Sequence, residues 1–338
     1  MGRNVRVAVD AMGGDNAPGE IVKGALEALK ASKDLTLVVV GQQKPLEREL
    51  KKYQYDKSRV EVVFATEVIE MAEPPVVAIR KKKDSSICVG LNMVKQKKAD
   101  AFVSSGSTGA VLAGGQLIVG RKKGVERPPL APIVPTAAGP FLLIDCGANV
   151  DAKSSQLVQF AKMGAIYMEC VAGVKNPRVG IVNIGAEDEK GNALVKETFP
   201  LLKQCTDLNF IGSVEARDIP YGVCDVAVCE AFVGNVILKL YEGTSAMFLQ
   251  EVKKTFLSSL RTKAGAMLLK PALKQTLKKF DASRYGGAPM LGLNGLVYKM
   301  HGSAKAKEVR NSIIQCVNFT KQDMVEKIGE KIAASAKE

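Results

Sequence analysis

One stretch of the sequence combines hydroxyl and amide donors with almost no side-chain bulk: residues 103–110, which read VSSGSTGA. The run before it, residues 99–103, is apolar and typical of a buried strand, so the bare stretch is expected where a strand gives way to a helix. Glycine admits positive φ and lets a ligand approach the main chain, while Ser and Thr can cap the helix. Unpaired N–H groups at a helix start attract an oxyanion. The stretch therefore predicts an anion site, which a phosphate would fit.

Four more segments of this kind follow strand-like runs, at residues 10–15, 145–151, 185–192 and 230–235. Any one of them is explained about equally well by a tight turn that needs small residues, but several together favour a site. None matches a known nucleotide motif, because residues 104–110 fit neither GxGxxG nor the Walker pattern. The spacing Gly106-Ser-Thr-Gly109 also differs from that of a nucleophile elbow.

The elements that would position these loops alternate along the chain. Apolar runs of strand length lie at residues 5–9, 35–40, 60–64, 99–103, 141–144, 179–184, 209–212 and 227–229. Helical patterns, such as the one from Glu20 to Ala31, separate most of them. This order predicts an α/β fold with a largely parallel sheet, helices on both faces and ligands at the carboxyl ends of the strands. No linker or repeat is evident, so residues 1–338 are expected to form one unit.

Composition narrows the class of protein. A chain of 338 residues with 46% hydrophobic content can bury a large core. The start MGRNVRVAVDAMGG has no secretory pattern, and no apolar run reaches the roughly 18 residues that a membrane-spanning helix needs. The seven cysteines are scattered without a CxxC pair, so we expect reduced thiols and a cytoplasmic protein.

Basic residues outnumber acidic ones, and they are unevenly distributed along the chain. Lys and Arg number 48 against 35 Asp and Glu, a formal net charge of +13, which favours an anionic partner. Much of the excess lies between residues 251 and 280, where eight basic residues stand against one acidic residue. Phe248, Val252, Phe256 and Leu260 follow helical spacing there, and an apolar side continues beyond an expected break near Pro271. Residues 245–280 thus predict a basic amphipathic helical hairpin, suited to an anionic membrane or an acidic protein; an ordinary dimer-interface helix is the alternative.

Seven stretches, in order, carry a family resemblance: VAVDAMGGD, VSSGSTGA, LLIDCGANVDAK, VNIGAEDEKGN, NFIGSVEARDI, CEAFVGNVILK and YGGAPMLGLNGLVYKMHGS. Together they resemble the bacterial phosphate acyltransferase (PlsX) family over nearly the whole chain. The resemblance implies a three-layer α/β/α fold, similar to isocitrate and isopropylmalate dehydrogenases and phosphotransacetylases, and a homodimer. It also implies transfer of a long-chain fatty acyl group from acyl carrier protein to inorganic phosphate for phospholipid synthesis, without a cofactor. Ser107 stands where the family more often has Asn, and residues 230–232 read Glu-Ala-Phe where it more often has Asp-Gly-Phe.

This chemistry asks mainly for an anion held beside an acyl carbonyl and for stabilisation of the tetrahedral oxyanion. We predict a phosphate cradle of main-chain N–H and hydroxyl groups, walled by two glycines: Ser105, Gly106, Ser107, Thr108 and Gly109, with Gly13 and Gly14. Lys190 is the candidate cation at the reacting centre, although a lysine in an acidic loop is more often a solvated ion-pair partner. His301, the only histidine, is the candidate donor to the leaving sulfur or the oxyanion, although a His before Gly-Ser is more often a turn residue.

The other polar candidates stand near strand ends, where they bind substrate or brace loops: Asp10, Asp145, Asn149, Asp151, Asn183, Asn192 and Asn235. Carboxylates would repel phosphate, and their spacing is not diagnostic of a metal, so no metal is assigned. The hairpin residues expected to meet a membrane or the carrier are Phe248, Val252, Lys253, Lys254, Phe256, Leu260, Arg261, Lys263, Lys270 and Lys274. The expected location is cytoplasmic, peripherally bound to the inner face of the cell membrane.

Three other classes of protein fit the sequence less well. An NAD-dependent decarboxylating dehydrogenase would share the fold, but no dinucleotide fingerprint or metal-binding carboxylate cluster is present. A short-chain phosphotransacetylase would use a soluble thioester and would not need the basic hairpin. Nucleic-acid binding has only the net charge in its favour, since the basic segment has few aromatic residues and no recognised motif.

Overall fold

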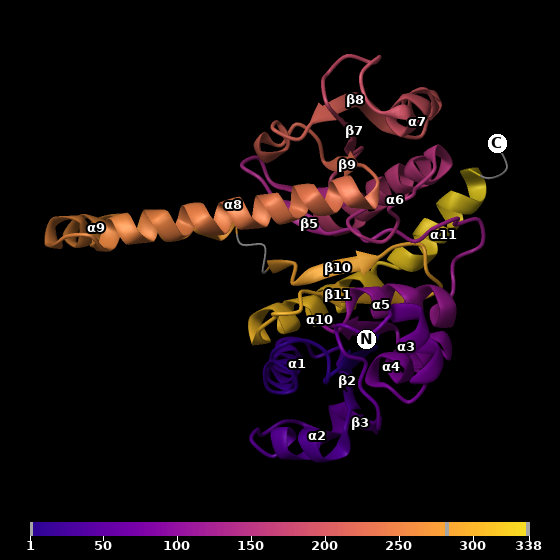
Figure 1. Cartoon of the computed structure of the whole chain (residues 1–338). Helices are drawn as coiled ribbons and strands as arrows, with labels where there is room; N and C mark the ends of the chain where they lie inside the picture. The colour runs from indigo at the N-terminus through magenta and orange to yellow at the C-terminus, as the bar shows by residue number, and fades with distance from the viewer. Residues whose placement is uncertain (1–2, 281–283, 336–338) are drawn as a thin grey trace.

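The computed structural model describes residues 3–280 and 284–335. Within this part of the chain the strands form two sheets, stacked as the lower and upper halves of Figure 1. The chain builds most of the first sheet, crosses to the second, and returns near its end to complete the first. The α/β class is confirmed, but the single sheet expected from the sequence is divided into two.

The first sheet has six strands in the order β10-β11-β4-β1-β2-β3. Their bounds are β1 (Val5–Asp10), β2 (Leu35–Gly41), β3 (Val60–Phe64), β4 (Ala101–Ser104), β10 (Gly287–Met290) and β11 (Leu296–Met300). All neighbours are parallel except β10 and β11. The strands β1, β2 and β4 are buried on both faces, which explains why they read as nearly continuous apolar runs in the sequence.

Helices cover both faces of this sheet. One face packs on α1 (Gly19–Ala31) and α10 (Ala306–Lys321), through a core that includes Val7, Val9 and Tyr298. The other face packs on α3 (Pro75–Lys81), α4 (Ser86–Lys95) and α5 (Thr108–Gly114), through a core that includes Phe102 and Val297. The short helix α2 (Gln43–Leu50) follows β2, the 3-10 turn η1 (Lys57–Arg59) precedes β3, and the π-turn η2 (Gly115–Val119) continues α5.

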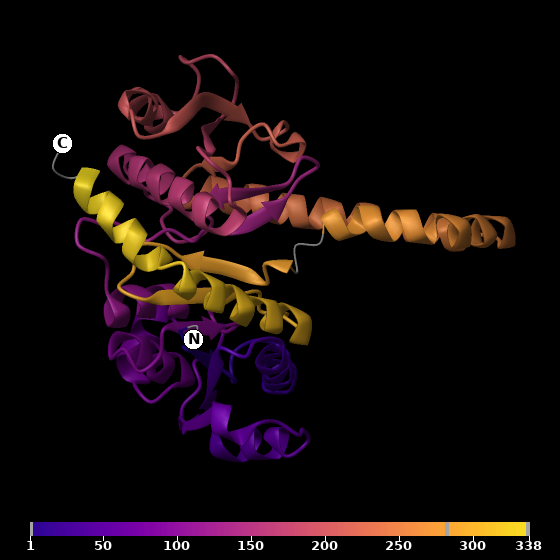
Figure 2. The same ribbon diagram turned by 180° about the vertical axis from the view of Figure 1, so that it is seen from behind.

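The second sheet has five strands in the order β5-β6-β9-β7-β8. Their bounds are β5 (Ile133–Pro135), β6 (Pro140–Ile144), β7 (Arg178–Asn183), β8 (Asn209–Glu215) and β9 (Val226–Val228), and only β5 is antiparallel to its neighbour. Its helices are α6 (Ser154–Ala172), α7 (Ala193–Gln204) and α11 (Met324–Ser335), and the 3-10 turn η3 (Ile219–Tyr221) precedes β9. Residues of α6, α10 and α11 belong to one core that spans both sheets, and Figure 2, seen from behind, shows α10 and α11 running in front of them.

Two long helices, α8 (Ala231–Leu257) and α9 (Leu260–Lys279), form an arm that leaves the body (Figure 1). The expected break near Pro271 is wrong, because Pro271 lies inside α9. The chain turns at Ser258 and Ser259 instead, where the Ser259 hydroxyl accepts from the N–H of Thr262 at 3.2 Å and starts α9. Leu260 therefore begins α9 and does not extend the apolar stripe of α8. No helix among the described residues is long and apolar enough to cross a membrane.

Candidate active site

Three neighbouring strands of the first sheet end in polar side chains that lie in a row. Lys299 on β11 pairs with Ser104 on β4, and Val9 of β1 pairs with Val103, which puts Asp10 beside Ser104. Side chains alternate between the faces of a strand, so Asp10, Ser104 and Lys299 share the face that α5 covers. Asp10 and Ser104 are fully buried, and Lys299 is 7% exposed.

Asp10 braces the loops around it. Its carboxylate accepts from the N–H groups of Met12 at 3.0 Å and Gly13 at 3.2 Å, and from the hydroxyl of Ser104 at 2.6 Å. The N–H of Gly106 in turn donates to the Ser104 hydroxyl at 3.0 Å. Both oxygens of Asp10 are thus occupied by the protein, which supports the loop-bracing reading over direct contact with a substrate.

The loops after β1, β4 and β11 fit together so closely that only glycine suits their contacts. A Cβ on Gly13 would lie 2.6 Å from the Gly106 nitrogen. Gly14 has φ of +92°, and a Cβ there would lie 2.6 Å from the Ser105 hydroxyl and 2.7 Å from the carbonyl of Gly302. The Ser105 hydroxyl donates to the carbonyl of Gly13 at 2.7 Å. The structure therefore brings Gly13 and Gly14 against Ser105 and Gly106, and it adds Gly302, the neighbour of the candidate His301, to this contact.

The start of α5 offers unused donors beside this junction. Ser107 caps the helix, its hydroxyl accepting from the N–H of Ala110 at 3.4 Å. Across the described residues, the N–H groups of Thr108 and Gly109 donate no hydrogen bond to the protein. Gly109 packs so closely on Pro75 that a Cβ would lie 2.4 Å from the proline ring. We call the loops at residues 13–14, 105–109 and 301–302 the cradle.

Sequence reasoning missed Lys299. Its ammonium donates to the carbonyl of Met300, and burial lowers its pKa from 10.5 to about 8, with a smaller contribution from Lys239 of α8. The nearby carboxylates of Asp10 and Asp15 act in the opposite direction. A single lysine inside the apolar run LVYKM was the available signal.

His301 directly follows β11 and is exposed. Its Nδ1 lies 2.8 Å from the hydroxyl of Ser303 and 3.3 Å from the N–H of the same residue, which holds the ring in a turn. The next residue, Gly302, accepts from the N–H of Asp15 at 2.9 Å and adjoins Gly14. The His301 loop therefore borders the cradle, and the catalytic role of His301 stays a prediction.

Lys190 lies on the second sheet, in the loop between β7 and α7. Its ammonium pairs with Glu187 at 2.8 Å, and half of its side chain is exposed. Asn183 donates to the Lys190 carbonyl at 3.0 Å, and Asn192 caps α7 by accepting from the N–H of Val195 at 2.9 Å. Figure 1 places β7 and α7 near the top of the molecule and α5 lower down, below β10. The structure thus groups Asn183, Lys190 and Asn192 with one another after β7 of the second sheet, whereas the cradle loops follow strands of the first sheet.

Asp145, which follows β6, is fully buried. Its carboxylate accepts from the N–H of Leu130 at 2.9 Å, the N–H of Asn149 at 2.8 Å and the Asn149 amide at 2.7 Å. Burial nevertheless raises the pKa of Asp145 to about 6. Asn149 is therefore held inside the protein, whereas Asp151 and Asn235 are exposed.

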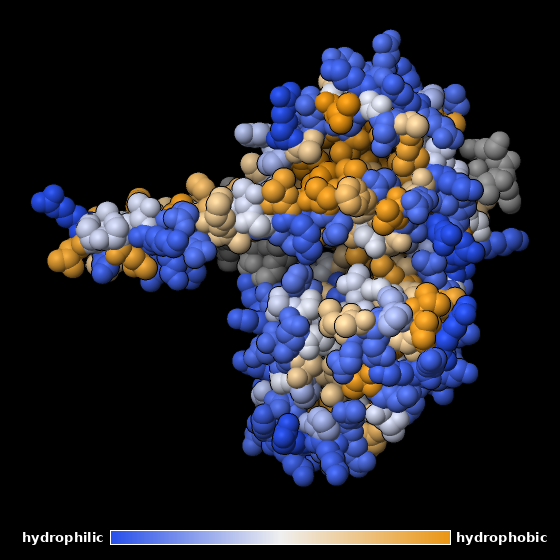
Figure 3. All heavy atoms as spheres, in the orientation of Figure 1, coloured by the Kyte–Doolittle hydropathy of each residue, from blue (hydrophilic) through white to orange (hydrophobic). Residues whose placement is uncertain are grey.

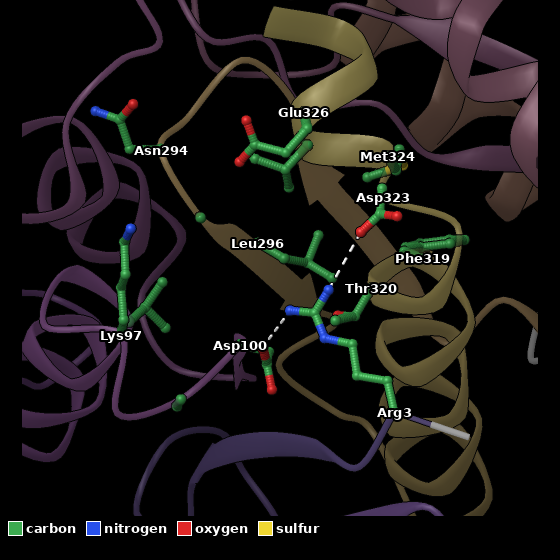
Figure 4. Close-up of a pocket in the computed structure, with 14 residues that line it drawn as sticks. Arg3, Lys97, Asp100, Asn294, Leu296, Phe319, Thr320, Asp323, Met324 and Glu326 are labelled. Atoms are coloured by element: carbon green, nitrogen blue, oxygen red, sulfur yellow. Dashed lines mark hydrogen bonds and ion pairs between the residues drawn. The ribbon is translucent and has the colours of Figure 1, made fainter. Parts of the chain in front are cut away.

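A pocket of about 230 Å³ lies at the opposite, amino edge of the first sheet (Figure 4). Arg3 reaches across it to Asp100 at 2.8 Å and Asp323 at 3.2 Å. These ion pairs tie the start of β1 to the turn between α10 and α11. Parallel sheets bind ligands at their carboxyl edge, so we assign this pocket a structural role.

The fold is that of an α/β protein, and the cradle lies at the carboxyl edge of its parallel first sheet, which is where such sheets bind ligands. Comparison with known proteins adds the family. A family model described as "Fatty acid synthesis protein" matches residues 5–327. A phosphate acyltransferase of Clostridium novyi is 50% identical over 328 residues, covering 97% of this chain and 98% of that protein. A phosphate acyltransferase of Thermoanaerobacter pseudethanolicus is 49% identical, covering 99% of each.

The chain belongs to the phosphate acyltransferase family and is an acyltransferase. Its fold is also found in a solved phosphotransacetylase from Streptococcus pyogenes, with a TM-score of 0.63, 17% identity, and coverage of 96% of this chain and 94% of that one. A branched-chain phosphotransacylase from Enterococcus faecalis has a TM-score of 0.55 and 13% identity, covering 93% of this chain and 98% of that one. At these identities the likeness concerns the fold alone.

Proposed function

We propose that this acyltransferase moves a long-chain fatty acyl group from the thioester of acyl carrier protein to inorganic phosphate. The family supports phosphate as the acceptor. The observation that carries the proposal is the cradle, where three loops meet beside the unused N–H groups of Thr108 and Gly109. Main-chain donors at the start of a helix suit a phosphate oxyanion, and they cost no rearrangement when the anion binds.

In the proposed reaction a phosphate oxygen attacks the thioester carbonyl. The new C–O bond gives a tetrahedral oxyanion, and its collapse breaks the C–S bond and releases the carrier thiol. The thiolate is a moderate leaving group with a pKa of about 8.5, so proton transfer from His301 is useful but not demanding. Lys190 is the proposed cation for the oxyanion. Neither step needs a cofactor.

A direct assay tests the reaction. Purified protein is mixed with acyl-acyl carrier protein and phosphate, and both acyl phosphate and free carrier thiol are measured. We expect equal amounts of the two, and neither when phosphate is omitted. Replacing the donor with short-chain acyl-coenzyme A separates the proposal from a short-chain phosphotransacetylase. Faster transfer from the soluble short-chain thioester would refute the carrier and chain-length part of the proposal.

We further propose that the arm docks the protein on anionic membrane, at the inner face of the cell membrane. Figure 3 shows both hydrophobic and hydrophilic residues on the surface of the arm. Leu260 is 83% exposed and Leu268 is 85% exposed, while Val252 and Phe256 are half-buried. Six basic residues stand exposed beside them: Lys253, Lys254, Arg261, Lys263, Lys270 and Lys274. Exposed apolar side chains flanked by lysines suit the boundary between the headgroups and the acyl chains of an anionic membrane.

The membrane proposal is tested by flotation with vesicles that contain anionic lipid. The double substitution Leu260→Glu and Leu268→Glu is expected to abolish flotation without loss of the fold. The double substitution Gln250→Glu and Gln275→Glu adds the same charge at exposed polar positions of the arm and is the matched control. Equal loss in both variants would indicate a pure charge effect. If both variants float like the wild type, carrier docking becomes the remaining use of the arm.

We also propose a homodimer, which the exposed apolar residues of α8 support. Met247 is 57% exposed, Phe248 64% and Leu249 44%, and a second copy of the chain would cover them. Light scattering of the purified protein is expected to give twice the chain mass. Phe248→Glu should yield a folded monomer, and an unchanged dimer in that variant would remove α8 from the interface.

A further inference from the structure

We infer that Lys299, at the end of β11, is the cation that binds phosphate in the cradle. The inference rests on the proposed function and deepens it, since it names the charged partner of the acceptor substrate. The residue lies outside the loops from which the sequence analysis drew its candidates.

The position of Lys299 in the first sheet supports this role. Lys299 pairs with Ser104 in the parallel ladder, and Ser104 is followed directly by the loop that starts α5. On the same face of the sheet the next side chain along is Asp10, whose carboxylate fixes Gly13 and, through Ser104, Gly106. Lys299 therefore stands beneath the cradle, on the side of the sheet that carries the unused donors.

The buried positive charge of Lys299 also supports this role. Lys299 is 7% exposed, and throughout the described residues no carboxylate lies within 4.0 Å of its ammonium. The Met300 carbonyl uses one of its three N–H donors. Asp10 is near, but both of its oxygens already accept from other groups. A buried ammonium without a close counter-ion is costly, and a bound anion would remove that cost.

A second buried lysine of the same protein does have a carboxylate close to its ammonium. Lys162 on α6 is also 7% exposed, and its ammonium lies 3.3 Å from the carboxylate of Asp207. The depressed pKa of Lys299, about 8, agrees with a cation whose counter-ion is not supplied by the chain. The two residues have equal burial and differ in partner, so Lys162 provides the control.

The test compares Lys299→Met, Lys299→Arg and Lys162→Met in the full-length protein. A charge-assisted hydrogen bond contributes enough that its loss should raise the KM for phosphate about 10- to 100-fold. The KM for the acyl donor should stay within about twofold, and Lys299→Arg should recover part of the phosphate affinity. Lys162→Met should lower the melting temperature and leave both KM values near those of the wild type.

A binding measurement covers the case in which the Lys299 variants are inactive. Inorganic phosphate should raise the melting temperature of the wild type and of Lys162→Met, because a ligand stabilises the state that binds it. It should raise that of Lys299→Met far less. If instead Lys299 merely balances the charge of Asp10, the double substitution Asp10→Asn with Lys299→Met should restore phosphate affinity, and that result would overturn the inference.

The proposed function and the role of Lys299 can be refuted separately. A wild-type protein that forms no acyl phosphate from phosphate and an acyl thioester would end the proposed function. A wild-type protein that forms it, together with a folded Lys299→Met whose phosphate KM and phosphate-induced stabilisation are normal, would end this inference alone.

Discussion

The carboxyl edges of the two sheets use the same residue types in different ways. At the first edge Asp10 braces the loops, and Lys299 is buried with no carboxylate within 4.0 Å of its ammonium among the described residues. At the second edge Asp145 braces the loops, but Lys190 is half-exposed and paired with Glu187. The difference teaches that a lysine near a strand end is open to an anion only when the chain leaves its charge without a close partner. The predictions below test that contrast, beginning with the largest expected effect.

The substitution Gly14→Ala tests the loops at the carboxyl edge of the first sheet. Its Cβ would meet the Ser105 hydroxyl and the Gly302 carbonyl in a backbone conformation of φ +92°, so the three loops must separate. Misplacing the donors should lower kcat/KM about 100- to 1,000-fold. Gly243→Ala is the control, because a Cβ there meets nothing within 4 Å. Near-normal kcat/KM in Gly14→Ala would show that the cradle is not the reacting centre.

The substitution Asp145→Ala tests the hydrogen bonds that the Asp145 carboxylate accepts at the carboxyl edge of the second sheet. It leaves the N–H groups of Leu130 and Asn149 without their acceptor inside the protein. We expect the free energy of unfolding to fall by about 3 kcal/mol. Urea denaturation measures the change. Any activity that survives should show an unchanged KM for phosphate, and a selective rise in that KM would mean that both edges bind the anion.

The pH dependence of phosphate binding sharpens the contrast between the lysines. Burial lowers the pKa of Lys299 to about 8, with Lys239 acting in the same direction and Asp10 and Asp15 opposing it. The cation is therefore present below about pH 8 and is lost as the pH rises through that value. The KM for phosphate should then rise by up to about tenfold per pH unit. Steady-state kinetics between pH 7 and 10 measure it, and the rise should move to higher pH in Lys299→Arg.

Lys190→Met should have the smallest of these effects. If Lys190 assists the oxyanion, kcat should fall about tenfold while the KM for phosphate stays within about twofold. Glu187→Gln, which frees Lys190 from its ion pair, is the matched variant and should retain more activity. An unchanged kcat in Lys190→Met would remove Lys190 from the mechanism.

Much of the fold was readable from the sequence, because buried parallel strands are continuous apolar runs. The runs at 5–9, 35–40 and 60–64 all became strands near those limits. The strands β10 and β11 were missed because their segment, YGGAPMLGLNGLVYKM, is broken by glycine and proline and resembles loop. Periodicity within a segment also does not show which strands will be neighbours, so the division into two sheets was not foreseen.

The arrangement of the cradle loops was predicted in part. The bare loop at 104–110 and the pair Gly13–Gly14 do meet, because both follow parallel strands that end at one edge. Lys299 was missed because its strand was missed, and with it the face shared with Asp10 and Ser104. The hairpin was expected, but its turn was placed at Pro271, since the cap formed by Ser259 and Thr262 was not considered.

The central claim is that phosphate binds in the cradle. A crystal structure of the protein soaked in inorganic phosphate tests it most directly. The account predicts an anion within hydrogen-bonding distance of the N–H groups of Thr108 and Gly109 and of the Lys299 ammonium. An anion held at the Lys190 loop, with the cradle empty at a phosphate concentration that saturates activity, would contradict it.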